Sequence, residues 1–535
     1  IIVKPNKIRY NETSDKGGDK MTKLLKKFIS IITHRIFIIP LLMILQIALI
    51  LLIILKYNQY FVHFYLISFI LSFIMAIYII NGKSNPGYKI AWLIPTMGLP
   101  VFGIILYMIF GMNQLSTHEK KKLKKLYYKV QDNQNKKDLV MDELKYESLN
   151  AHNQAKYICD YSPSSVCKHT KTTYLSGGEV YFEKLMDALK KAHKYIFLEY
   201  FIIREGYMWN NILELLKTKV EEGVDVRLIY DDLGCIVTLP NHYEKRLNKL
   251  GIKTVVFNKF IPRLRSRFNN RDHRKIAVID GYICFTGGIN LADEYMNKQV
   301  RFGYWKDNGI MLEGAAAWNF TTMFLSMWDF ITGENTNLKE YMPPHELVYT
   351  TPSDGYIVPY EDNPWDHEAV GETIYLNLIN KANRYIYITT PYLIIDNEMI
   401  TALITAAKRG VDVKIITPGI PDKKIVSEVT KAYYNQLIEG GIRIYEFTKG
   451  FVHEKTFVVD DEYATVGTVN LDYRSLYLHF ECGVWLYASS TIHNIKKDVQ
   501  KTLKESREIK KKGIEKLSFF KNLKRQILKA FAPLM

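Results

Sequence analysis

Two stretches of the chain share one pattern, His-x-Lys-x4-Asp-x6-Gly-x2-Asn. The first copy consists of His273, Lys275, Asp280, Gly287 and Asn290, and the second of His453, Lys455, Asp460, Gly467 and Asn470. The His-Lys-Asp core alone has a chance of about 10⁻⁴ per window at ordinary residue frequencies. Two copies with the same internal spacing therefore indicate an internal repeat.

The residues around both motifs predict strands. HRKIAVID at 273–280 and HEKTFVVD at 453–460 are rich in β-branched residues. Side chains at i and i+2 project from the same face of a strand, so each histidine is expected beside its own lysine. Asp280 and Asp460 have the opposite parity and are expected to support the site from behind.

This combination of side chains predicts chemistry on a phosphodiester. Two such strands brought together would present two imidazoles and two ammonium groups to one small volume. The ammonium groups would hold phosphoryl oxygens, one imidazole would attack the phosphorus, and the other would protonate the leaving oxygen. The two lysines and an imidazolium supply the positive charge, so we expect no metal ion and no cofactor.

The two halves of the chain can be aligned with each other. The matched segments are 192–202 with 382–394, 223–232 with 410–419, and the residues around Gly251 with those around Gly441. Both halves read as strand, helix, strand, helix, strand and then motif, which predicts a duplicated α/β unit.

The first half carries an additional basic run at 258–272. It contains Arg263, Arg265, Arg267 and Arg271. A solvated loop and a contact with anionic lipid both fit this run.

The N-terminal region predicts a membrane anchor. Residues 36–55 and 61–80 are uncharged apolar runs, each long enough to cross a hydrocarbon core of about 30 Å. Pro95, Gly98, Pro100 and Gly103 interrupt a third apolar stretch at 91–111. Basic residues flank the region on both sides, which favours an even number of crossings. We expect two spans, with the third stretch in or dipping into the inner leaflet; three spans is the alternative.

Composition agrees with a membrane enzyme. The 535 residues carry a formal charge of +17, which suits a polyanion; the anchor favours anionic lipid over nucleic acid. The five cysteines are scattered, so neither a disulfide framework nor a zinc site is expected. The last segment alternates apolar and basic residues at helical spacing, which fits packing on the catalytic domain, binding to the membrane surface, or both.

These features predict six segments. They are a leader at 1–20 upstream of a start at Met21, a membrane anchor at 21–111, a linker at 112–170, two lobes at 171–335 and 336–490, and a basic amphipathic tail at 491–535.

The double motif resembles that of the phospholipase D superfamily. The segments 198–206, 271–295 and 450–476 and the terminal APLM are similar to those of bacterial cardiolipin synthases. The resemblance implies two homologous phospholipase D-like α/β lobes that share one active site, in a multi-pass protein of the bacterial cytoplasmic membrane. It also implies the reaction: phosphatidyl transfer between two phosphatidylglycerol molecules, giving cardiolipin and glycerol.

The resemblance further assigns residue roles. His273 would be the nucleophile and His453 the acid and then the base; Lys275, Lys455, Asn290 and Asn470 would bind phosphoryl oxygens. Asp307 and Glu481 share the frame acid-x-Gly-apolar-x-Leu. A carboxylate on one ring nitrogen fixes the tautomer of a histidine, and the resemblance implies this role for both acids. The motifs themselves are too alike to distinguish the two histidines.

Other functions remain open at this stage. A hydrolytic phospholipase D or a serine-accepting phosphatidyltransferase differs mainly in the nucleophile of the second step. A nuclease and a catalytically inactive membrane scaffold are more distant alternatives. One departure from the family pattern is Asp272, where Asn is expected before the first motif histidine; a carboxylate there would tend to raise the pKa of His273.

Overall fold

A computed structural model of the chain describes residues 44, 45, 48, 51, 52, 55–111, 117–134, 139–259, 269–510 and 519–534. The described residues up to Gly82, together with those from Trp92 to Gly111, form one compact unit. The remaining described residues form a second, larger unit, which we call the catalytic unit. The predicted leader at 1–20 lies outside the described residues, and most of the predicted span at 36–55 does too.

The smaller unit contains the apolar helices of the N-terminal region. Within the described part of the chain, α3 (Phe61–Asn81) is the one helix long and apolar enough to cross a membrane, and it coincides with the predicted second span. The third apolar stretch is a broken helix, α4 (Pro86–Gly98) followed by α5 (Pro100–Leu106) and the π-helical turn η2 (Tyr107–Gly111). Leu99 leaves the helical region with φ −131° and ψ 73° at this break, and Pro100 cannot donate a backbone hydrogen bond.

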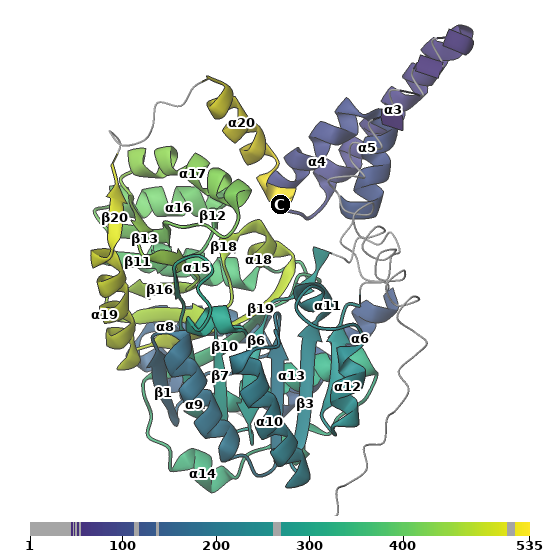
Figure 1. Cartoon of the computed structure of the whole chain (residues 1–535). Helices are drawn as coiled ribbons and strands as arrows, with labels where there is room; N and C mark the ends of the chain where they lie inside the picture. The colour runs from purple at the N-terminus through teal and green to yellow at the C-terminus, as the bar shows by residue number, and fades with distance from the viewer. Residues whose placement is uncertain are drawn as a thin grey trace, which may run out of the picture. The chain divides into compact units, whose positions relative to one another are not determined.

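The catalytic unit is built on two sheets with the same strand order (Figure 1). The first sheet runs β1-β9-β7-β6-β2-β3-β4 and the second β10-β19-β17-β16-β11-β13-β14, followed by β20. The first sheet consists of β1 (Thr170–Leu175), β2 (Tyr195–Tyr200), β3 (Asp225–Asp231), β4 (Lys253–Phe257), β6 (Lys275–Ile279), β7 (Ile283–Gly287) and β9 (Gly309–Gly314). The second consists of β10 (Tyr356–Asp362), β11 (Tyr385–Thr389), β13 (Asp412–Pro418), β14 (Arg443–Phe447), β16 (Thr456–Val459), β17 (Tyr463–Gly467), β19 (His479–Tyr487) and β20 (Ser506–Ile509).

The strand directions repeat as well. β2, β3 and β4 are parallel, as are β11, β13 and β14, whereas each motif strand, β6 or β16, is antiparallel to its neighbours. The duplicated α/β unit that the internal alignment predicts is therefore present strand by strand.

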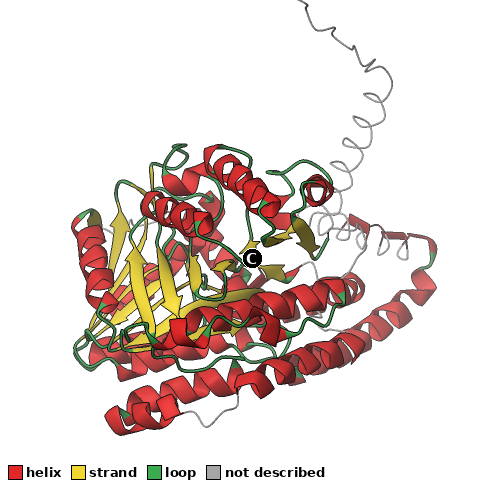
Figure 2. Cartoon of the chain, turned by 90° about the horizontal axis from the view of Figure 1, so that it is seen from below, coloured by secondary structure: helices red, strands yellow, loops and turns green. Residues whose placement is uncertain are grey.

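Helices lie around the strands (Figure 2), and three apolar clusters bury the faces of the two sheets. The outer face of the first sheet packs against α9 (Gly178–Lys190), α10 (Tyr207–Glu221) and α12 (Tyr243–Lys249). The outer face of the second packs against α8 (Leu149–Tyr161), α15 (Val370–Lys381), α16 (Asn397–Lys408) and α17 (Lys424–Glu439). The inner faces share one apolar cluster with α13 (Ala316–Thr332) and α19 (Thr491–Lys504).

The sequence accounts for these helices through their apolar spacing. In α10 the buried residues Met208, Trp209, Ile212, Leu213 and Leu216 recur at helical intervals and form one stripe toward the sheet. Further helical elements complete the fold. They are α6 (Thr117–Gln134), α7 (Leu139–Glu147), α11 (Asp232–Cys235), α14 (His345–Tyr349), α18 (Tyr473–Tyr477), η1 (Asn58–Tyr60), η4 (Asp293–Met296), η5 (Leu338–Tyr341) and η7 (Ala532–Leu534).

The C-terminal tail ends in helix α20 (Phe519–Ala530). One side packs on α17: Arg525 pairs with Glu428 at 2.8 Å, and Lys529 lies over the ring of Tyr433. The opposite side exposes Phe519 and Phe520, at 75% and 79%, together with Leu523 and Ile527. The tail therefore packs on the catalytic unit and still presents an apolar face.

Candidate active site

The strands are shorter than the predicted 273–280 and 453–460: each motif histidine lies two or three residues before the strand of its sheet, in a short break between two strands. His273 precedes β6, which Lys275 begins, and His453 precedes β16, which begins directly after Lys455. Each lysine ammonium donates a hydrogen bond to the carbonyl oxygen of its own histidine. The expected side-by-side placement of histidine and lysine is present in both halves.

Two short parallel ladders join the halves at this point. β5 (Arg271–Asp272) pairs with the start of β19, and β15 (Gly450–Val452) pairs with β8 (Tyr304–Lys306). The His273 backbone N–H then donates to the Phe480 carbonyl at 2.9 Å, and the His453 N–H donates to the Lys306 carbonyl at 2.7 Å. The segment that leads into each histidine is thus held by the segment that leads into the carboxylate of the other half.

The two carboxylates bind the histidines crosswise. Asp307, from the first half, lies 2.7 Å from His453 Nδ1. Glu481, from the second half, lies 3.0 and 2.9 Å from His273 Nδ1 through its two oxygens. A neutral imidazole that donates through Nδ1 carries its lone pair on Nε2, so both rings have the tautomer required for attack or proton transfer through Nε2.

Close approach of the halves requires a glycine at position 288. A Cβ at Gly288 would lie 2.0 Å from the Asp307 carboxylate and 3.0 Å from the His453 carbonyl. Because these distances are too short for a methyl group, any larger residue would force the carboxylate away from its histidine.

The site is buried and rich in cationic groups. Burial and the neighbouring Lys455 lower the pKa of His453 to about 4. Burial, Lys275 and Lys455 also hold the pKa of His273 well below its usual range. Burial lowers the pKa of Lys275 to about 8 and that of Lys455 to about 7. An anionic phosphodiester would stabilise all four protonated forms, so the site is electrostatically prepared for an anion.

Asp280 and Asp460 lie at the far ends of the motif strands. Asp280 accepts backbone N–H groups from His193, Lys194 and Tyr195. Asp460 accepts the matching set from Asn383, Arg384 and Tyr385. The Asp280 carboxylate therefore fixes the start of β2, and the Asp460 carboxylate fixes the start of β11. Both carboxylates have a structural role at the strand next to the motif.

The two motif asparagines differ in their bonding. Asn290 accepts the Ile202 N–H through Oδ1 and donates to the Tyr295 hydroxyl at 2.8 Å. Asn470 is also buried, but its Oδ1 has no hydrogen-bond partner among the described residues. Asn290 is thus engaged by its own half to a greater extent than Asn470.

Several groups around the histidines were not singled out from the sequence. Trp305 Nε1 donates to Asp307 at 3.2 Å, and the Thr468 hydroxyl donates to Glu481. Phe201 packs edge-on against His273 and Tyr295 edge-on against His453. His479 lies beside His273. Trp305 and His479 each stand two residues before a site carboxylate, so strand periodicity could have identified both.

The residue between each histidine and lysine points to the opposite face. Arg274 pairs with Glu199 and Asp272 of the first half and, at 2.8 Å, with Glu361 of the second. At the equivalent position Glu454 pairs with Lys306 at 2.6 Å. An ion pair thus joins the halves behind each motif. The motif residue is the cation in the first pair, Arg274, and the anion in the second, Glu454. Arg274, Glu199, Asp272 and Glu361 form one charged cluster, the Arg274 cluster. The Asp272 carboxylate does not raise the pKa of His273 overall, because burial and the lysines lower it.

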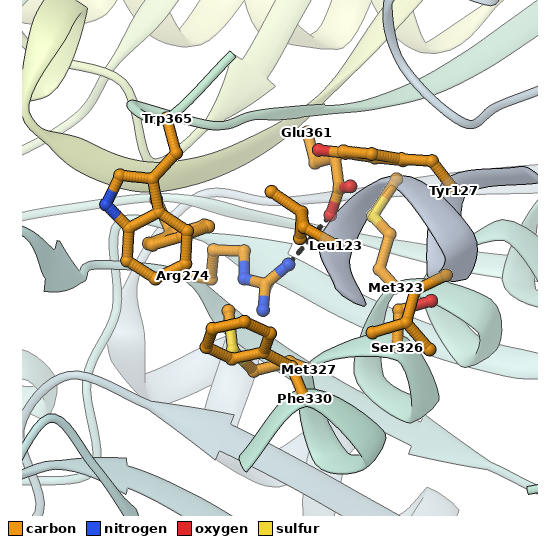
Figure 3. Close-up of a pocket in the computed structure, with 11 residues that line it drawn as sticks. Leu123, Tyr127, Arg274, Met323, Ser326, Met327, Phe330, Glu361 and Trp365 are labelled. Carbon is orange, nitrogen blue, oxygen red and sulfur yellow. Dashed lines mark hydrogen bonds and ion pairs between the residues drawn. The ribbon is translucent and has the colours of Figure 1, made fainter. Parts of the chain in front are cut away.

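A small cavity borders the Arg274 cluster (Figure 3). Arg274 and Glu361 form part of its wall with Tyr127 of α6 and Met323 and Phe330 of α13. Its volume of about 20 Å³ is room for about one water molecule and no more. It is therefore a packing defect beside a buried ion pair and too small for a lipid.

The additional basic run at 258–272 is only partly described. Arg263, Arg265 and Arg267 lie outside the described residues. Arg271 is buried and pairs with Asp231 at 3.2 Å, so neither a solvated loop nor a lipid contact describes this arginine.

Within the described part of the chain, one group of side chains has ligand atoms close enough together for a metal ion. It comprises His273, His479 and Glu481, whose ligand atoms lie within 4.8 Å of one another. The ammonium groups of Lys275 and Lys455 act on the same volume, and their charge opposes a cation there.

Comparison with known proteins identifies the family. A family model described as cardiolipin synthase, phospholipase D-like domain, matches residues 185–328 and 375–503. A second model, the phospholipase D-nuclease N-terminal region, matches residues 70–111.

Individual relatives extend over most of the chain. A cardiolipin synthase from Alkalihalophilus pseudofirmus is 33% identical over 88% of this chain and 93% of its own length. One from Halalkalibacterium halodurans is 30% identical over the same shares. An uncharacterized protein from Streptococcus mutans is 45% identical over 86% of this chain and 99% of its own.

A solved structure supports the fold. The crystal structure of a phosphatidylserine synthase from Haemophilus influenzae covers 71% of this chain and 97% of its own, with a TM-score of 0.53 and 16% identity. The duplicated sheets and both matched halves agree with this likeness. The chain belongs to the bacterial cardiolipin synthases of the phospholipase D superfamily and is a phosphatidyltransferase.

Proposed function

We propose that the protein transfers a phosphatidyl group from one phosphatidylglycerol to another through a covalent phosphatidyl-histidine. The crosswise carboxylate pairs carry this proposal, because they give both imidazoles a free Nε2 lone pair in one cationic site. In the first step His273 Nε2 forms a bond to phosphorus, and the bond from phosphorus to the glycerol oxygen breaks. His453 enters this step as the imidazolium, which the bound phosphodiester stabilises, and it gives its Nε2 proton to the glycerol oxygen.

The second step reverses these roles. The neutral His453 removes a proton from the hydroxyl of a second phosphatidylglycerol, whose oxygen attacks phosphorus. The phosphorus–nitrogen bond breaks, and cardiolipin leaves. One phosphodiester replaces another, so the reaction requires no nucleotide.

The remaining site residues support these steps. Lys275 and Lys455 neutralise the phosphoryl oxygens in a site with little water, where such charges act strongly. Asn290 and Asn470 bind the same oxygens through their amides. Asp307 and Glu481 stabilise the imidazolium form of the histidine that each contacts. Asp280 and Asp460 act through the fold, by fixing the strands beside the motifs.

We also propose that the protein is a multi-pass protein of the cytoplasmic membrane. The spans are residues 36–55 and α3, and the broken helix from Pro86 to Gly111 lies in or near the inner leaflet. Helix α20 carries basic residues and no acidic one. Together with its apolar face, this charge suits the surface of the same anionic membrane. Confinement of donor and acceptor to one bilayer favours the lipid hydroxyl over water.

The first prediction concerns the shared site. His273→Ala and His453→Ala should each abolish turnover, and the double variant should be no worse, because groups that act as a unit are not additive. Turnover of phosphatidylglycerol by purified protein measures this, with the exposed His493→Ala as the control. Substantial activity in either single variant contradicts a shared site. If a labelled phosphatidyl group is instead trapped on His453, then His453 is the nucleophile and His273 is the acid and base.

The second prediction concerns the products. Protein given only phosphatidylglycerol should release glycerol and cardiolipin in equal amounts, measured by mass spectrometry, and excess glycerol should reverse the reaction. Phosphatidic acid as the main product at every lipid density would identify a hydrolytic phospholipase D. A requirement for CDP-diacylglycerol would instead favour the serine-accepting alternative.

The third prediction concerns pH. The pKa values of about 8 for Lys275 and about 7 for Lys455 mean that the free site loses positive charge as pH rises through this range. The kcat/KM ratio should therefore fall on the alkaline side, since it reports on the free enzyme. Arginine stays protonated there, so Lys455→Arg should move the fall to higher pH. The exposed Lys171→Arg should leave the profile unchanged, and an unshifted profile in Lys455→Arg would refute the assignment.

The fourth prediction concerns topology. A cysteine at Gln59, before α3, should react with an impermeant maleimide added to intact cells, in a background that carries Cys159→Ser. A cysteine at the exposed Lys121 of α6 should react only after permeabilisation. Labelling of both positions from outside would exclude two spans.

A further inference from the structure

The two site carboxylates have matching neighbours two residues before them. Trp305, on β8, lies two residues before Asp307, and His479, on β19, lies two residues before Glu481. The Trp305 ring lies 5.4 Å from His453, and the His479 ring lies 5.5 Å from His273. Both occupy the ladders that join the halves, where Trp305 pairs with Phe451 and His479 with Arg271. The two side chains are therefore equivalent by position.

Their polar atoms face the same kind of partner. The Trp305 indole N–H donates to Asp307 at 3.2 Å. His479 Nδ1 lies 3.5 Å from Glu481 Oε1, is buried, and makes no hydrogen bond of good geometry. Thr468 donates to the other oxygen, Oε2. The place that an indole N–H fills in one half is thus taken by an imidazole nitrogen in the other.

Arg474 determines which nitrogen of His479 carries the proton. Its Nε donates to His479 Nε2 at 3.4 Å. A guanidinium can only donate, so Nε2 is the acceptor and the proton of the neutral ring sits on Nδ1, facing Glu481. Burial lowers the pKa of His479 to about 3, so the ring is neutral at physiological pH.

We propose that His479 is a positioning residue whose Nδ1–H orients Glu481 toward His273, as the indole N–H of Trp305 orients Asp307 toward His453. The inference rests on the proposed role of His273. His479 and Thr468 would each hold one oxygen of Glu481, so the carboxylate faces His273 Nδ1 in a fixed plane.

Loss of this donor has a defined electrostatic consequence. A carboxylate that accepts fewer hydrogen bonds is more basic and stabilises a neighbouring imidazolium more strongly. The other titratable groups that act on His273 are Lys275, Lys455, His453 and Lys423, and none of them changes in the variants below. Removal of the His479 donor should therefore raise the pKa of His273.

Three variants at position 479 separate the donor from the shape. Nδ1 of histidine and Nδ2 of asparagine are both bonded to Cγ, so His479→Asn keeps an N–H donor at the place of Nδ1. His479→Leu and His479→Met place uncharged apolar side chains of similar size there without an N–H donor. Trp305→Phe is the matched change in the other half. Two quantities are measured: kcat on phosphatidylglycerol vesicles, and the pH midpoint of His273 modification by diethyl pyrocarbonate, read by peptide mass spectrometry.

The Leu and Met variants should lose about tenfold to a hundredfold in kcat, the range for one hydrogen bond to a charged group. Both should also raise the midpoint of His273 modification. The Asn variant should stay near the wild type in both measurements, and Trp305→Phe should lower kcat without moving the His273 midpoint.

Wild-type behaviour of His479→Leu, or equal losses in Asn and Leu with one common midpoint, would overturn the proposal. If the Leu variant does not fold, equal behaviour of the Asn and Met variants would overturn it. The modification midpoint does not depend on the lipid product. Failure of the wild type to form cardiolipin would therefore overturn the proposed function and leave this comparison valid.

Discussion

The site depends on a reciprocal pairing between the halves, in which each half supplies a histidine that the other half orients. His273 contacts Glu481, and His453 contacts Asp307, both through Nδ1. The pairing requires the lobes to dock within a fraction of an ångström, since a hydrogen bond weakens quickly with distance and angle. The two short ladders that cross between the halves, β5 with β19 and β8 with β15, provide this precision through backbone hydrogen bonds. Neither lobe alone contains both a motif histidine and the carboxylate that contacts its Nδ1.

Successive residues of each motif have different tasks. Histidine and lysine face the site, while the residue between them points away and joins the lobes from behind. A buried ion pair is weak evidence for stability, since desolvation offsets much of the attraction. Arg274 and Glu454 carry opposite charges at equivalent positions, and each pairs with the other half. We infer that these pairs specify the register of docking more than they stabilise the fold.

The electrostatics of the site follow from its burial. Two lysines and two histidines share a volume where burial disfavours every charged form, and their pKa values are correspondingly lowered. Such a cluster of cationic groups is unfavourable by itself, and a bound anion would stabilise it. A phosphodiester supplies that charge at the place where the transition state accumulates it. The same positive charge makes the group formed by His273, His479 and Glu481 a poor site for a cation.

The repeat, a strand in each motif, the placement of each lysine beside its histidine, and the apolar helix over residues 61–80 could be predicted from the sequence, although both histidines lie just outside the strands. These properties depend on local periodicity: two residues per repeat on a strand, and an unbroken apolar run across a membrane. The two carboxylates could also be found, from their shared frame and the family resemblance. The folded chain was needed to show that each carboxylate contacts the histidine of the other half, that Arg271 is buried, and that His479 is equivalent in position to Trp305. Those contacts join residues far apart in the chain, and the docking of two folded lobes, which no local pattern encodes, brings them together.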